Sequence, residues 1–185
     1  MTRTIGLYGG FFNPLHKGHL HVIKTSTKSL KLKKLILLPT YQNPLKENQN
    51  PKSINSQISE LRLQIKEPLA KVSDFEHRYQ MKSTYDVLKK ISTKCSLNSF
   101  YLIIGLDQLG HFHEWMEYEW ITKNISICVI YRPRYDDFIE NSTIKKQHPN
   151  LFMPNLAKFI NSSTPCFHIL GDSGVNLSSS ELRDV

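Results

Sequence analysis

Short apolar runs alternate along this chain with segments of helical spacing, and this alternation constrains the fold more than any other feature. Three such runs, each ended by glycine or proline, cover residues 35–38, 100–104 and 125–131. Apolar runs of this length between helical segments are typical of βαβ units, whose parallel strands are buried on both faces. We therefore predict an α/β fold with a mainly parallel sheet and flanking helices.

The remaining elements follow from the same patterns. Further strands are predicted at 4–8, 71–75 and 167–170, and helices at 17–30, 54–65 and 84–91. Residues 135–164 are polar and irregular, so we expect them to form the most mobile or variable stretch. Ser178, with Glu181 three residues later, predicts a helix start.

Functional residues are expected directly after the strands, because ligands of parallel sheets bind beyond the carboxyl ends of the strands. The segments that meet this condition are 8–19, 38–46, 105–108 and 132–133. The first of them is the most informative, since it combines a glycine turn, an Asn-Pro bend and two histidines.

The composition is that of an ordinary soluble protein. Its 185 residues suggest one domain. No apolar run approaches the roughly 18 residues of a membrane span, and glycines near the N-terminus interrupt any signal peptide. The three cysteines are far apart and odd in number, which argues against a disulfide framework or a paired-cysteine zinc site. We expect a cytoplasmic protein without a membrane partner.

The positive charge is concentrated in the first third of the chain. The formal net charge is +8, and residues 1–60 carry nine basic against two acidic side chains. This balance suggests an anionic partner. Charge alone leaves a nucleic acid, a membrane surface and a polyphosphate ligand open, and a solvated lysine face accounts for most of the excess.

The segment after the first predicted strand has the properties of a phosphate-binding site. His16 and His19 are three residues apart at the start of a predicted helix, so their side chains share a face. A helix N-terminus already attracts anions through its free N–H groups and its dipole. Gly18, between the histidines, lets a ligand approach the backbone closely.

Other motifs do not fit this segment. A P-loop requires Gly-Lys-Ser/Thr at its end, whereas Lys17 precedes Gly18 here. The G-x-G-x-x-G spacing of a dinucleotide fingerprint is missing as well. A zinc site needs a third ligand, and no other histidine has a recognised spacing to His16 and His19. Two ordinary surface histidines remain the alternative.

The segment 9–19 resembles the first signature of the nucleotidyltransferase superfamily that carries an H-x-G-H motif. In particular it resembles the signature of bacterial nicotinate-nucleotide adenylyltransferases, G-G-x-F-[DN]-P-x-H-x-G-H. Later segments are similar to further family motifs in the same order: Asn43-Pro44-Leu45-Lys46, Thr84-Tyr85-Asp86-Val87-Leu88, Gly105-Leu106-Asp107-Gln108-Leu109, His113-Glu114-Trp115, Arg132-Pro133 and Ser178-Ser179-Ser180-Glu181-Leu182-Arg183. The resemblance implies a Rossmann-like, doubly wound sheet formed by one nucleotidyltransferase domain over residues 1–185.

The resemblance also implies an activity. An adenylyl group would pass from ATP to nicotinate mononucleotide, giving deamido-NAD and pyrophosphate in NAD biosynthesis. The acceptor phosphate is itself the nucleophile, so such a reaction needs positioning and charge neutralisation along an in-line path. Mg²⁺ is expected to bind through the ATP phosphates and water, and no protein metal site is predicted.

Site residues are carried over position by position. Catalytic roles are predicted for His16, His19 and Arg183, which would neutralise charge on the transferred and leaving phosphates. The predicted ATP-binding residues are Gly9, Gly10, Phe11, His16, Gly18, His19, Gly105, Asp107, Ser178, Ser179 and Arg183. The predicted acceptor-binding residues are Asn13, Lys46, Thr84, Trp115 and Arg132. For Asp107 the alternative role is that of a helix cap. For Trp115 the alternative is a position in the core.

The clearest departure from the family pattern is at the C-terminus, whereas Asn13 for Asp and Ser180 for Thr are milder changes. The chain ends two residues after Arg183, where family members usually continue with a further helix. We therefore expect this C-terminal helix to be short or missing. The sequence leaves homo-oligomerisation open.

Competing functions are kept beside this one. Within the superfamily the acceptor could be phosphopantetheine or nicotinamide mononucleotide. In another class, the chain would be a non-catalytic protein that binds nucleotides or nucleic acid. No nucleic-acid-binding motif is visible, so a nucleic-acid partner is not expected. The presence of His16, His19 and Arg183 argues against an inactive relative.

Overall fold

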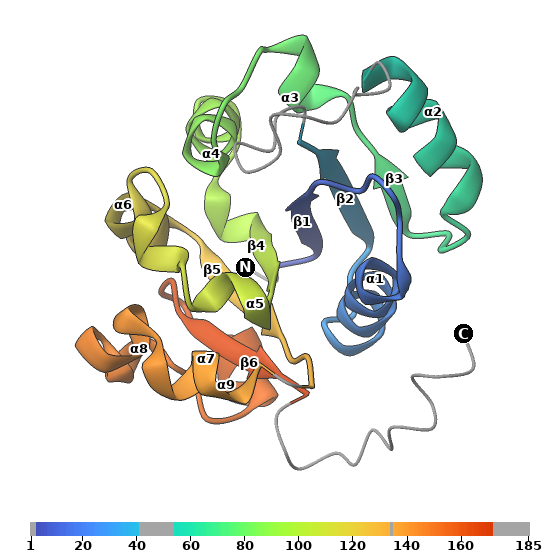
Figure 1. Cartoon of the computed structure of the whole chain (residues 1–185). Coiled ribbons are helices and arrows are strands. Elements are labelled where there is room, and N and C mark those ends of the chain that lie inside the picture. The colour runs from blue at the N-terminus through green and yellow to red at the C-terminus, as the bar shows by residue number, and fades with distance from the viewer. Residues whose placement is uncertain (1–2, 41–53, 134, 172–185) are drawn as a thin grey trace.

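A parallel β-sheet runs through the centre of the molecule (Figure 1). The computed structural model describes residues 3–40, 54–133 and 135–171. Within these residues the strands are β1 (Ile5–Gly10), β2 (Lys34–Pro39), β3 (Ala70–Val72), β4 (Phe100–Gly105), β5 (Ser126–Ile130) and β6 (Phe167–Leu170). They form one sheet in the order β3-β2-β1-β4-β5-β6, and every pairing is parallel.

Helices connect these strands. They are α1 (Lys17–Ser29), α2 (Ile54–Gln64), α3 (Phe75–Arg78), α4 (Thr84–Ser92), α5 (Leu106–Leu109), α6 (Tyr118–Asn124), α7 (Asp136–Asn141), α8 (Thr143–Gln147) and α9 (Leu156–Asn161), with short 3₁₀ turns at Leu97–Ser99, Phe112–Glu114 and Pro149–Leu151. No helix among the described residues is long and apolar enough to cross a membrane.

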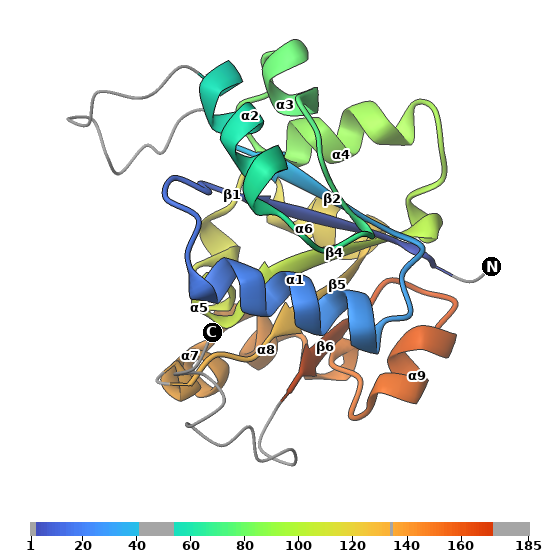
Figure 2. The same ribbon diagram turned by 90° about the vertical axis from the view of Figure 1, so that its right-hand side faces the viewer.

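Helices cover both faces of the sheet, as Figure 2 shows for α4 on one side and α1 and α9 on the other. The strand side chains alternate between two buried clusters. Leu102 and Ile104 of β4 join Leu88 of α4, whereas Tyr101 and Ile103 join the cluster of α1 and α9. The predicted doubly wound, parallel α/β fold is therefore confirmed.

The site position follows from the topology. The chain crosses from β1 outward to β3, then returns to β4 on the other side of β1. The loops after β1 and β4 therefore diverge, and this topological switch point is where open α/β sheets bind ligands.

Two predictions were wrong. Residues 135–164 contain α7, α8 and α9 instead of an irregular stretch. Most side chains of these helices are polar, and the buried apolar residues Ile139, Ile144 and Phe159 are widely spaced in the sequence. The segment 71–75 is strand only to Val72, and Phe75 already begins α3.

Candidate active site

A cavity of about 690 Å³ opens at the carboxyl ends of the central strands. It brings together most of the predicted site residues, although they come from four separate parts of the chain. Those that line it are Gly9, Gly10, Phe11, Asn13, His16, His19, Thr84, Gly105, Asp107, Trp115 and Arg132. Gly18 lies beside the cavity, against Arg132. The predicted residues Lys46, Ser178, Ser179 and Arg183 lie outside the described residues.

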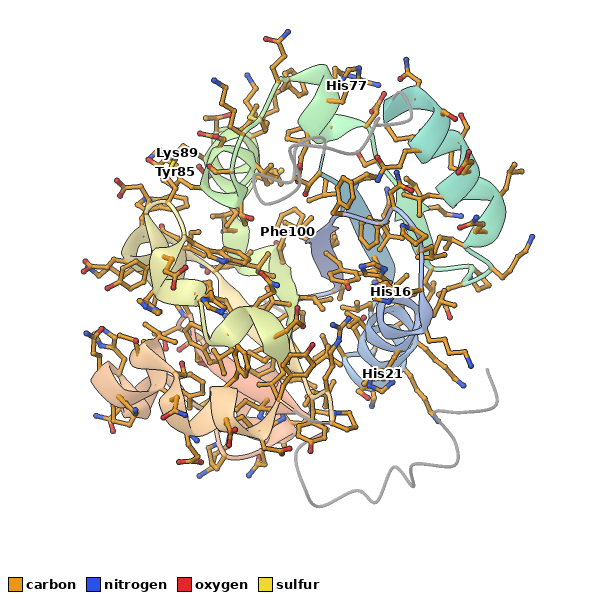
Figure 3. All side chains as sticks on the ribbon, viewed as in Figure 1. His16, His21, His77, Tyr85, Lys89 and Phe100 are labelled. Carbon is orange, nitrogen blue, oxygen red and sulfur yellow. The ribbon has the colours of Figure 1, made fainter. Side chains whose placement is uncertain are left out.

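His16 is the N-cap of α1. Its backbone is extended, with φ −137° and ψ 169°, and its Nδ1 accepts a hydrogen bond of 3.1 Å from the N–H of Gly18. A neutral imidazole that accepts at Nδ1 carries its proton on Nε2. The cap therefore sets the tautomer and leaves an Nε2–H donor for a ligand. Figure 3 shows His16 and His21 on opposite sides of α1.

His19 lies under His16 and is held from below by an aromatic ring. The two imidazoles stack with centroids 3.7 Å apart, and Phe12 meets His19 edge-on at 4.9 Å. Burial, together with neighbouring His16 and Arg132, lowers the pKa of His19 to about 4. Burial and Arg132 also lower the pKa of His16. Both rings are therefore neutral at pH 7.

Arg132, directly after β5, joins the two halves of the site. Its Nη1 donates to Oδ1 of Asp107 at 3.0 Å, and both side chains are largely buried. Its Nη2 lies so close to α1 that a Cβ on Gly18 would come within 2.8 Å. A Cβ at this position would therefore require the guanidinium of Arg132 to move away from the start of α1.

Two buried polar atoms at the site have no partner among the described residues, Nδ1 of His19 and Nε of Arg132. Buried polar atoms are normally hydrogen-bonded. Both residues line the cavity in which a polar ligand would bind.

The other side of the cavity is formed by Thr84 and Trp115. Thr84 is the first residue of α4, whose start is fixed by a capping box between Ser83 and Asp86. Trp115 is half-buried and packs on Phe112, with ring centroids 5.1 Å apart. The tryptophan thus belongs both to the edge of the core and to the cavity wall.

Several polar residues of the cavity wall received no predicted role. Tyr8 and Thr40 lie in the predicted segments 8–19 and 38–46, whereas Glu76, His111 and Glu114 lie outside them. Burial raises the pKa of Tyr8, so its hydroxyl stays neutral. The condition that functional residues follow strands also covers Glu76. It comes shortly after β3, so its position meets this condition.

The described residues contain no group of three or more histidine, cysteine, aspartate or glutamate side chains that could hold a metal ion. The carboxylate of Asp107 is already paired with Arg132.

Comparison with known proteins assigns the chain to a family. The cytidylyltransferase-like family model matches residues 7–185. A probable nicotinate-nucleotide adenylyltransferase of Pelagibacter ubique is 32% identical over 182 residues, which cover 98% of this chain and 92% of the relative. A protein of the same name from Methylorubrum extorquens is 36% identical over 131 residues, 71% of each chain.

Solved structures share the fold. A nicotinic acid mononucleotide adenylyltransferase of Plasmodium falciparum, complexed with NaAD, superposes with a TM-score of 0.59 at 17% identity. The match covers 76% of this chain and 72% of that one. A putative nicotinate-nucleotide adenylyltransferase from Vibrio parahaemolyticus gives a TM-score of 0.51 at 21% identity, over 80% and 93% of the two chains. The chain therefore belongs to the cytidylyltransferase-like family, and within it to the nicotinate-nucleotide adenylyltransferases.

Proposed function

We propose that this protein transfers the adenylyl group of ATP to nicotinate mononucleotide, releasing pyrophosphate and forming deamido-NAD. The observation that carries the proposal is the stacked pair His16 and His19 at the start of α1, inside a cavity that extends to both sides of β1. The names of the relatives, at 32% to 36% identity, support the same acceptor.

The reaction needs no enzyme nucleophile. A phosphate oxygen of the mononucleotide attacks the α-phosphorus of ATP, and the bond from that phosphorus to the pyrophosphate oxygen breaks. No proton has to move, so the protein's task is alignment and neutralisation of charge. This matches a site built from hydrogen-bond donors and one guanidinium.

The phosphate-binding donors lie at the start of α1. The Nε2–H of His16 is free to donate, because Nδ1 is occupied by Gly18. His19, neutral and stacked below, supplies the second imidazole. Negative phosphates raise the pKa of nearby histidines, so both rings gain positive character when ATP binds. The guanidinium of Arg132 can leave the carboxylate of Asp107 and donate instead to a phosphate oxygen.

ATP is proposed to enter on the side of β4 and β5. Gly105 gives close backbone access there, since a Cβ would collide with Asp107. Arg183, Ser178 and Ser179 remain the proposed ligands of the β- and γ-phosphates. Mg²⁺ would come with the ATP phosphates and neutralise the charge of the departing pyrophosphate.

The acceptor is proposed to bind on the side of β2 and α4. Thr84 offers a hydroxyl for the nicotinate carboxylate, and Trp115 a surface for the pyridine ring. Asn13 and Lys46 complete the proposed acceptor site. Because its substrates are metabolites of the cell interior, we also infer a cytoplasmic location.

The test is pyrophosphate release from ATP and Mg²⁺ with three acceptors in parallel. We expect clear preference for nicotinate mononucleotide over nicotinamide mononucleotide and phosphopantetheine. Preference for another acceptor would keep the chemistry and overturn the substrate. Absence of turnover with all three, from folded protein, would overturn the activity.

A further inference from the structure

Glu76 places a carboxyl group in the cavity wall, on the opposite side of β1 from the Asp107–Arg132 pair. It belongs to α3, the short helix after β3, and its Oε1 lies 3.9 Å from the position of a Cβ on Gly9. The carboxyl group therefore borders the carboxyl end of β1, next to the turn that leads to His16.

The surroundings of this carboxyl group are unfavourable for a charge. Thr40 donates a hydrogen bond to it, and burial raises the pKa of Glu76 to about 7. No ion pair joins Glu76 to a cation in the ranges 3–40, 54–133 and 135–171. A desolvated carboxylate without a cation costs stability. Glu76 thus lowers stability and also lines a ligand cavity. Such a combination indicates a role in binding the ligand.

The position of Glu76 indicates which part of the acceptor it would contact. In the proposed function, phosphates bind at His16 and His19, and the pyridine ring binds near Thr84 and Trp115. The ribose of the acceptor has to connect these two places. Glu76 lines the cavity on the acceptor side of β1, beside Gly9, where that connection passes.

The chemistry of a carboxylate agrees with this placement. Above its pKa of about 7 the Glu76 carboxylate only accepts hydrogen bonds, and it would repel both the phosphate and the nicotinate carboxylate of the acceptor. The ribose is the part of the mononucleotide that offers neutral O–H donors, at its 2′ and 3′ positions. With one hydrogen bond from Thr40, the carboxylate keeps acceptor capacity for such hydroxyls.

We propose that Glu76 binds the ribose hydroxyls of the acceptor mononucleotide and thereby positions the acceptor phosphate for attack. The inference rests on the proposed adenylyl transfer. It adds a binding residue that selects a ribonucleotide over its deoxy form.

The experiment is a thermodynamic cycle that combines a change of residue 76 with the removal of a ribose hydroxyl from the substrate. Initial rates are measured at pH 8, above the pKa of Glu76, for wild type and Glu76→Gln with nicotinate mononucleotide and with its 2′-deoxy and 3′-deoxy analogues. Hydrogen bonds to a charged group are strong, so wild type should lose about 10- to 100-fold in kcat/KM on at least one analogue. Glu76→Gln should show a similar loss, mainly in KM, on the natural acceptor, and should no longer discriminate against that analogue.

Controls separate this outcome from misfolding and from failure of the proposed function. Asp74→Asn removes an exposed carboxylate two residues away, which pairs with Arg78, and should leave all rates unchanged. The KM for ATP should stay the same in Glu76→Gln. Full discrimination retained by that variant, or a change confined to the KM for ATP, would overturn the role of Glu76 alone. A wild-type protein inactive on nicotinate mononucleotide would overturn both proposals.

Discussion

The rings of His16 and His19 stack 3.7 Å apart, with 23° between their planes. Each ring is held by a different contact, His16 by the N–H of Gly18 and His19 by the edge of Phe12. The pair is therefore preorganised without a bound ligand. Preorganised donors need no rearrangement at the moment of reaction, which is the condition for effective electrostatic stabilisation.

Removal of either imidazole should abolish most of the activity. We expect His16→Ala and His19→Ala each to lower kcat by about 10²- to 10³-fold, the usual cost of one preorganised donor. Steady-state rates with saturating ATP and nicotinate mononucleotide measure the effect. His148→Gln changes an exposed histidine at the end of α8, away from the cavity, and is the control that should retain full activity.

The cap role of His16 can be separated from its role toward phosphate. Alanine at an N-cap costs about 0.5–2 kcal/mol of stability, whereas asparagine caps well. His16→Asn should therefore unfold at the wild-type temperature and still lose activity as His16→Ala does. Activity within tenfold of wild type in His16→Asn would show that the cap, and not the imidazole, is what the reaction needs.

Stability should fall on acidification because His19 resists protonation in the folded state. The unfolded chain binds a proton near pH 6.5, whereas the pKa of folded His19 is about 4. Stability is therefore complete above pH 6.5 and decreases as the pH falls toward 4. The ring is partly exposed, so solvent screening limits the loss to about 1–2 kcal/mol. Urea unfolding at pH 7 and pH 4.5 should show a smaller difference for His19→Gln than for wild type.

Gly18 should matter for activity and not for stability. A Cβ there would lie 2.8 Å from Nη2 of Arg132 and 3.0 Å from Nδ1 of His16. Alanine is favoured over glycine in a helix by about 1 kcal/mol, so Gly18→Ala should fold at least as stably as wild type. Displacement of Arg132 and His16 should nevertheless reduce kcat/KM by at least about tenfold. Lys24→Ala, exposed on the same helix, should change neither property.

The sequence predicted β2, β4, β5 and β6 well because each is a short, largely apolar run. The prediction 167–170 coincides with β6, and β4 differs from 100–104 by one residue. The main error, at 135–164, has a physical cause. Short helices bury one or two side chains each, so the hydrophobic repeat that identifies longer helices never develops.

The site was predicted where local sequence determines geometry. The spacing of His16 and His19 alone places both rings on one face of α1. Distant contacts could not be anticipated in the same way. The ion pair of Arg132 with Asp107 depends on the register between β5 and β4, and the burial of Glu76 depends on the packing of α3 beside the carboxyl end of β1.

The contact between α7 and the end of α5 should contribute to stability. A Cβ on Gly110, just after α5, would collide with the ring of Phe138 in α7. Gly110→Ala should therefore cost about 1–3 kcal/mol, the usual effect of overpacking. Phe138→Leu in the same chain should recover part of this loss, which thermal unfolding of both variants measures. Equal stability of wild type and Gly110→Ala would contradict the packing of α7 on α5.

Glu76 should cost the protein stability at neutral pH. Its pKa is about 7 in the folded state, above the ordinary value of 4.5. The folded protein therefore keeps a proton that the unfolded chain has lost, and stability decreases as the pH rises from about 4.5 to 7. Glu76→Gln removes this penalty, so it should be more stable than wild type at pH 8 by about 1–3 kcal/mol and similar to it at pH 4.

Asp74 gives the matched comparison for this stability prediction, because its carboxylate lies on the same segment and has the opposite shift. The hydrogen bond from Arg78 lowers the pKa of exposed Asp74, so Asp74→Asn should bring no gain at high pH. Urea unfolding between pH 4 and pH 8 measures both variants. A stabilising Glu76→Gln that also loses selection for the ribose would show that this carboxyl group is retained for binding at the expense of the fold. Equal stability of Glu76→Gln and wild type across this pH range would mean that Glu76 is not desolvated.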